Sequence, residues 1–157
     1  YIKYYLTIGL LALQFASCDD TYISPIPDFP VYLELNLTTT YPTFRNSSNK
    51  SLIFIKGTTP NIPERAATGY GGILVYSGVM LDDAGNTIYY AFDMSCPYEH
   101  KQKILVHPND KGQAICDSCK TIFDISYGIG NPTSGPAKQT LRRYKTNLSG
   151  DILYITR

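Results

Sequence analysis

The first clear pattern along the chain is the alternation of apolar and polar residues over Val31–Thr38. Successive side chains of a β-strand point to opposite faces, so this alternation predicts a strand with one buried face. Three later segments are short, apolar and rich in β-branched or aromatic residues: Ser51–Lys56, Ile73–Met80 and Thr87–Asp93. We therefore expect strands throughout this part of the chain, with a hairpin turn at Asp82–Asn86, where glycine and asparagine accept a positive φ.

The second half of the chain continues the series of short apolar segments and has no convincing helical pattern. Further strands are predicted at Lys103–His107, Gln113–Ile115, Thr121–Ile125, Leu141–Leu148 and Asp151–Thr156. Glycine and proline are frequent in Thr58–Gly72 and Gly128–Pro136, which predicts irregular connections there. Many short strands at regular spacing indicate one all-β domain over residues 31–157, an antiparallel sandwich or small barrel.

The N-terminal segment differs from the rest of the chain. Residues 1–17 carry one charge, Lys3, and an apolar run that is too short to span a bilayer but fits the core of a signal peptide. The alternative, a buried N-terminal helix, does not explain the abrupt change to Asp19 and Asp20 after Cys18. Residues 18–30 are polar and rich in proline, which predicts a tether leading into the domain.

Phe15-Ala16-Ser17-Cys18 resembles a bacterial lipobox, the motif whose cysteine becomes the lipidated first residue of the mature protein. The resemblance implies a lipoprotein of the cell envelope that a lipid on Cys18 holds to the outer membrane. The motif does not indicate whether the protein lies on the periplasmic or the outer face of that membrane. The two aspartates that follow resemble the surface-export signal of Bacteroidetes lipoproteins.

Composition and charge narrow the range of functions. The net charge of +1 gives no reason to expect nucleic acid or an acidic partner, and no feature identifies a protein partner. The sequence contains no G-x-S-x-G, no H-E-x-x-H and no phosphate-binding loop. We therefore expect a protein that is not an enzyme.

The candidate chemistry lies in the stretch Tyr89–Asp124, where two strand-like segments each lead into a turn that contains cysteine. Cys96 lies in the first turn, and Cys116 and Cys119 form a C-x2-C pair in the second. With Cys18 set apart, three cysteines remain, so a pure disulfide framework would leave one thiol unpaired. Such turns suit a metal or iron–sulfur site, and the alternatives are a redox pair or inert reduced thiols.

From about Ile73 to its end the chain resembles a Rieske domain, in which two hairpin loops hold a [2Fe–2S] cluster through C-x-H and C-x2-H motifs. Cys96 matches the first cysteine and Cys116 the second, and the segment from Cys116 to Asp124 follows the second motif of the family. The loop that covers the cluster and the strand after it are matched by Gly135-Pro136-Ala137, Leu141 and Tyr144. The resemblance implies an antiparallel Rieske-like fold with two cysteine-bearing hairpin loops.

Both histidine positions of the family pattern are changed, because Tyr98 occupies the first and Cys119 the second. An ordinary Cys2His2 cluster is therefore not expected. His100 could complete a Cys3His set with Cys96, Cys116 and Cys119, ligand types that suit tetrahedral zinc. The alternative, which its charged neighbours favour, is that His100 is a solvated surface residue.

Two hypotheses follow from these motifs. The first is a membrane-anchored structural or binding module whose cysteine site is kept as a staple that holds zinc, a disulfide or nothing. The second is an electron-transfer protein of the envelope that carries an altered [2Fe–2S] centre on the same three cysteines and His100.

Overall fold

The computed structural model describes residues 24–157, and within that range the chain forms eleven strands and no helix. The predicted signal peptide, the lipobox and Cys18 lie outside the described residues. In residues 24–157 there is accordingly no helix with the length and apolar character needed to cross a membrane. The predicted all-β class is confirmed.

The larger of two sheets has seven strands in the order β2-β4-β5-β10-β11-β1-β3, and every pair of neighbours is antiparallel. Its strands are β1 (Val31–Asn36), β2 (Lys50–Phe54), β3 (Ala67–Thr68), β4 (Ile73–Leu81), β5 (Thr87–Asp93), β10 (Arg143–Ser149) and β11 (Ile152–Thr156). The smaller antiparallel sheet has the order β6-β7-β8-β9. Its strands are β6 (Val106–Pro108), β7 (Gln113–Cys116), β8 (Ile122–Asp124) and β9 (Asn131–Ser134).

The first six residues of strand β4 are buried on both faces because they separate two hydrophobic cores. Ile73 and Val75 belong to a core enclosed by the large sheet, whereas Leu74 and Tyr76 belong to a second core shared with the small sheet. A strand with two buried faces needs apolar residues at consecutive positions, which is why this segment shows a continuous apolar run instead of alternation. Cys96 and Cys116 of the candidate site are buried in the second core, and Cys119 packs against it.

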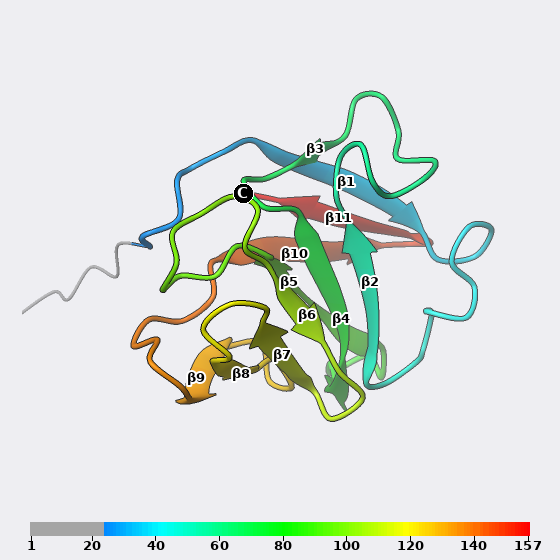
Figure 1. Ribbon diagram of the computed structural model, residues 1–157. Coiled ribbons are helices and arrows are strands. Elements are labelled where there is room, and N and C mark those ends of the chain that lie inside the picture. Colours follow the sequence, from blue (N-terminus) through cyan, green and yellow to red (C-terminus); the bar gives the residue numbers. More distant parts are fainter. Residues whose placement is uncertain (1–23) are drawn as a thin grey trace, which may run out of the picture.

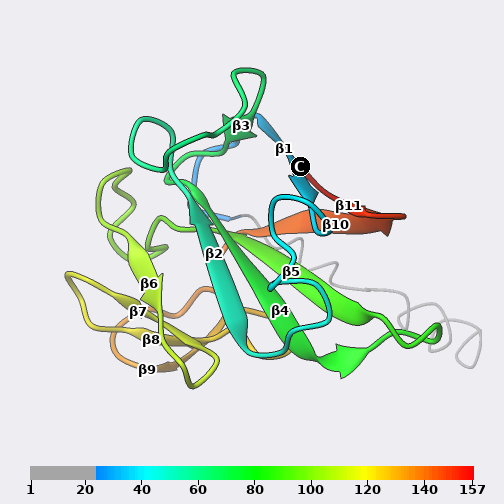
Figure 2. The same ribbon diagram turned by 90° about the vertical axis from the view of Figure 1, so that its right-hand side faces the viewer.

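The small sheet lies at one end of the molecule, beside β4 and β5 and away from β1, β3 and β11 (Figures 1 and 2). Phe92 at the end of β5 and Phe123 in β8 are fully buried in the core between the sheets. Removing side chains of this size from water stabilises the contact by about 1.5–3 kcal/mol each. This packing fixes the small sheet, and with it the cysteine-bearing turn between β7 and β8.

The structure differs from the sequence predictions in the irregular segments. Strand β9 lies inside the predicted loop Gly128–Pro136 and pairs with β8. It contains Pro132, which an edge strand accepts because one side of its backbone needs no partner. Strand β1 ends at Asn36 and not at Thr38, because the Asn36 side-chain oxygen accepts the backbone N–H groups of Thr38 and Thr39 and starts a turn.

Residues 24–30 lie against the domain, although the sequence predicted a tether for them. Ile26 is 1% exposed, and its carbonyl accepts a hydrogen bond from Arg142 at 2.9 Å. Asp28 forms ion pairs with Arg142 and Arg157 at 2.5 and 2.9 Å. The proline-rich composition predicts a tether, but the buried side chain of Ile26 and the carboxylate of Asp28 hold this segment against the domain.

Candidate metal centre

The first cysteine turn begins directly after β5. Cys96 is fully buried, and its backbone N–H donates to the Ile104 carbonyl at 3.1 Å. An isolated β-bridge between Ser95 and Leu105 closes the loop on both sides of the turn. These bonds fix the backbone that carries the Cys96 thiol before any metal binds.

The second turn connects β7 to β8. Cys116 is the last residue of β7 and is fully buried, whereas Cys119 is half-buried in the turn. The Cys116 N–H donates to the Thr121 carbonyl at 3.0 Å, which closes the base of the turn. The Asp117 N–H donates to the Leu105 carbonyl, also at 3.0 Å, and so attaches the second turn to the first loop.

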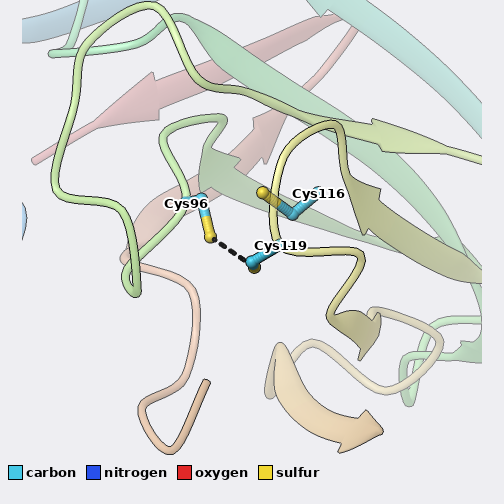
Figure 3. A group of neighbouring side chains, drawn as sticks. All are labelled: Cys96, Cys116 and Cys119. Carbon is cyan, nitrogen blue, oxygen red and sulfur yellow. Dashed lines mark hydrogen bonds between the residues drawn. The ribbon is translucent and has the colours of Figure 1, made fainter. Parts of the chain in front are cut away.

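The two turns bring the three sulfur atoms together. The Sγ atoms of Cys96, Cys116 and Cys119 all lie within 4.8 Å of one another, and those of Cys96 and Cys119 are 3.6 Å apart. All three are free thiols in the structure. Figure 3 shows Cys96 reaching from its loop toward the two cysteines of the other turn. The predicted convergence of three cysteines from two turns is therefore present.

The three thiols differ in their electrostatic surroundings. Burial raises the pKa of Cys96 to about 12, although the backbone N–H groups of Glu99 and Tyr98 face its sulfur and oppose this effect. Burial also raises the pKa of Cys119, but hydrogen bonds from Thr121 and the neighbouring thiols outweigh it, so the net pKa lies below the ordinary value. The Cys119 thiol is 3.2 Å from Thr121 Oγ1, a hydroxyl that can donate to the thiolate. A cation at the centre would favour the thiolate form of all three residues.

The spacing of the sulfurs fits one tetrahedral ion. Two Zn–S bonds of about 2.3 Å at a tetrahedral angle place their sulfurs about 3.8 Å apart, close to the 3.6 Å between Cys96 and Cys119. In a [2Fe–2S] cluster the ligands divide between two irons, so thiolates on different irons are held further apart. A mutual separation within 4.8 Å for all three sulfurs therefore fits a single ion better than a two-iron cluster.

The structure does not bring the fourth predicted ligand into this group. His100 is exposed, and neither of its ring nitrogens lies within the 4.8 Å group formed by the three sulfurs. Tyr98, which occupies the first histidine position of the Rieske pattern, is 52% exposed. The metal role of Cys96, His100, Cys116 and Cys119 remains a prediction.

A buried carboxylate beside the first turn escaped the sequence analysis. Asp93 is fully buried and accepts hydrogen bonds from the backbone N–H groups of Tyr70, Gly71 and Ser95 and from the Tyr144 hydroxyl. It links β10 and the Tyr70–Gly71 backbone to the start of the cysteine turn. The sequence signal that was available is a charged residue directly after the apolar segment YYAF. A carboxylate in such a position is buried only where several hydrogen-bond donors surround it, so it indicates a local cluster of donors.

The loop after β9 lies against the second turn, as the family resemblance implied. The Ala137 N–H donates to Thr121 Oγ1 at 3.2 Å, and Ala137 is buried in the core that contains the cysteines. Gly135 has φ +98°, and a Cβ at this position would come within 2.5 Å of the Thr121 Cα. Only glycine permits this close approach beside the site.

No protein-family model and no curated protein matches the chain. Among solved structures, the chain is similar to the ferredoxin of carbazole 1,9a-dioxygenase from Nocardioides aromaticivorans IC177, with 17% sequence identity and a TM-score of 0.43. The similarity covers 81% of this chain and 96% of the ferredoxin. A similarity of this size concerns the course of the backbone alone.

Proposed function

We propose that this protein is a non-catalytic, Rieske-like module of the cell envelope whose three cysteines hold one zinc ion as a structural staple. The observation that carries the proposal is the mutual separation of the three sulfurs within 4.8 Å. Thiolates are soft ligands that suit zinc, and structural zinc sites use two to four of them, with histidine as the other ligand type. Zinc would join the turn after β5 to the turn between β7 and β8.

The site chemistry also supports a structural role over electron transfer. A Rieske cluster owes its raised reduction potential to two histidines on one iron, and this chain has Tyr98 and Cys119 at those positions. Two of the three sulfurs are fully buried, which suits a closed structural site. Zinc has no redox chemistry, so its contribution would be folding free energy.

The proposed envelope location depends on the lipobox-like segment that ends at Cys18. A lipid on this cysteine would attach the domain to the membrane without a membrane-spanning helix. If so, mass spectrometry of the N-terminal peptide will find Cys18 acylated, and Cys18→Ser will move the protein from the membrane fraction to the soluble fraction. An unmodified Cys18 in membrane-extracted protein would refute the anchor but leave the metal site untouched.

Metal analysis with absorption and EPR spectra tests the zinc site directly. We expect about one zinc per chain, no visible absorption, and loss of the zinc in Cys96→Ser and Cys116→Ser. The competing function is electron transfer by an altered [2Fe–2S] centre. Stoichiometric iron, visible charge-transfer bands and an EPR signal after anaerobic reconstitution would establish that function and reject ours.

A further inference from the structure

The two cysteine turns share a closing hydrogen bond and a positive φ at their last residue. In the first, the His100 N–H donates to the Cys96 carbonyl at 3.1 Å, and in the second the Lys120 N–H donates to the Cys116 carbonyl at 3.2 Å. Each turn ends on a non-glycine residue with a positive φ, 54° at His100 and 59° at Lys120. Each is therefore a five-residue turn with cysteine at position 1 and a left-handed residue at position 5.

Positions 1 and 4 of such a turn point to the same side. In the second turn they are Cys116 and Cys119, whose sulfurs both belong to the three-thiol group. In the first turn position 4 is Glu99, which is half-buried and whose backbone N–H faces the Cys96 sulfur. In the first turn, Glu99 therefore occupies the backbone position that Cys119 occupies in the second.

The same comparison places His100 away from the site. His100 occupies position 5, which corresponds to Lys120, and the Lys120 ammonium group turns back to the Asp117 carbonyl. Both position 5 residues are exposed. A side chain at position 5 leaves a backbone of positive φ, whereas position 4 is the one that carries a sulfur of the site in the second turn.

We propose that the Glu99 carboxylate, and not His100, is the fourth protein ligand of the metal centre, which would make the donor set Cys3Glu. This inference rests on the zinc site proposed above. In the structure the Glu99 carboxylate lies outside the group of three sulfurs. Carboxylate oxygens bind zinc at about 2.0–2.2 Å, so the side chain must turn inward when the ion binds. Partial exposure keeps water near the added negative charge and limits the cost of placing it beside three thiolates.

The test is a Co²⁺ titration of the full chain under reducing conditions, followed by competition with Zn²⁺. The matched pair of variants is Glu99→Gln and His100→Gln, neighbouring residues that are not fully buried, and Glu99→Cys is a third variant. We expect Glu99→Gln to weaken Zn²⁺ binding by about tenfold or more, a loss at least as large as that from removing a supporting group of a metal site. His100→Gln should stay within about twofold of wild type, because position 5 does not reach the ion.

Glu99→Cys gives a spectroscopic readout that does not depend on affinity. Thiolate-to-Co²⁺ charge-transfer absorption grows with the number of thiolates, so this variant should gain about one third over wild type if residue 99 reaches the ion. Urea unfolding of the metal-free proteins controls for general destabilisation, and the three variants should unfold like wild type. Each of these residues is at least partly exposed.

The possible outcomes separate the two proposals. Wild-type protein that binds neither Co²⁺ nor Zn²⁺ refutes the zinc site itself. Wild-type protein that binds both ions, with Glu99→Gln unchanged, refutes Glu99 alone and indicates water or His100 as the fourth ligand. A loss confined to His100→Gln identifies the histidine instead.

Discussion

Asp93→Asn is the substitution that most directly tests how the site is held in the fold. One carboxylate oxygen of Asp93 accepts the N–H groups of Ser95 and Gly71 at 2.8 and 3.1 Å. The other accepts the Tyr70 N–H at 2.9 Å and the Tyr144 hydroxyl at 2.5 Å. An asparagine has the same shape but only one acceptor oxygen, so in either orientation its NH2 group faces a backbone donor.

The expected loss of stability follows from this geometry. One buried N–H left without an acceptor costs about 1–3 kcal/mol, and the remaining bonds lose the assistance of a full negative charge. We expect Asp93→Asn to lower the free energy of unfolding by about 2–4 kcal/mol, a large share of the 5–15 kcal/mol typical of a domain. Asp83→Asn is the matched control, because Asp83 is exposed, and its effect should stay within about 0.5 kcal/mol.

Equilibrium urea unfolding at neutral pH measures both variants, with a chelator and a reductant present so that neither metal nor disulfides contribute. A decrease in the midpoint without a change in slope would show a loss of stability alone. If Asp93→Asn unfolds within about 0.5 kcal/mol of wild type, the buried carboxylate does not organise these donors and the argument is wrong.

Three further predictions concern thiol reactivity, alkaline pH and a close backbone contact. In metal-free protein at pH 7, iodoacetamide should modify Cys119 before Cys96 and leave Cys96 almost untouched. A pKa of about 12 reduces the Cys96 thiolate about a thousandfold relative to a pKa of 9. Peptide mass spectrometry that finds both cysteines equally modified would contradict this. Burial raises the pKa of Tyr144, and the charge and hydrogen bond of Asp93 raise it further. The buried, protonated Tyr144 hydroxyl therefore contributes fully to stability below about pH 10, the ordinary pKa of tyrosine, and this contribution is lost as the pH rises further. Tyr144→Phe should therefore lose less stability than wild type between pH 10 and 11, by up to about 1.4 kcal/mol per pH unit, and parallel pH profiles would exclude this role. Gly71→Ala should lower the free energy of unfolding in urea more than Gly85→Ala. A Cβ at Gly71 would lie 2.7 Å from the Ser95 backbone nitrogen, whereas a Cβ at Gly85 would meet open space and only the φ of +81° disfavours alanine there. The reverse order would contradict the packing described here.

Most of the fold could be predicted from the sequence because strand patterns are local. The alternation in β1 and the apolar segments of β4 and β5 identified these strands. The irregular regions were harder, since β3 and β9 are short and exist through pairing with distant strands rather than through their own residues. The same holds for residues 24–30, where long-range contacts of Ile26 and Asp28 override a composition typical of tethers.

The candidate site was predictable only in part. The resemblance to the Rieske pattern indicated that Cys96 and Cys116 would meet although they are distant along the chain, and the C-x2-C spacing added Cys119. Sequence proximity then suggested His100, because histidine is a common metal ligand. The backbone conformation of the first turn, which no sequence pattern specified, points instead to position 4, Glu99.

The most direct test of the account is zinc K-edge X-ray absorption on the purified, reduced full chain. Three sulfurs at about 2.3 Å and one oxygen at about 2.0 Å are expected from a single ion held by the two turns. Two or fewer sulfurs around the zinc would contradict the claim that Cys96, Cys116 and Cys119 converge on one metal.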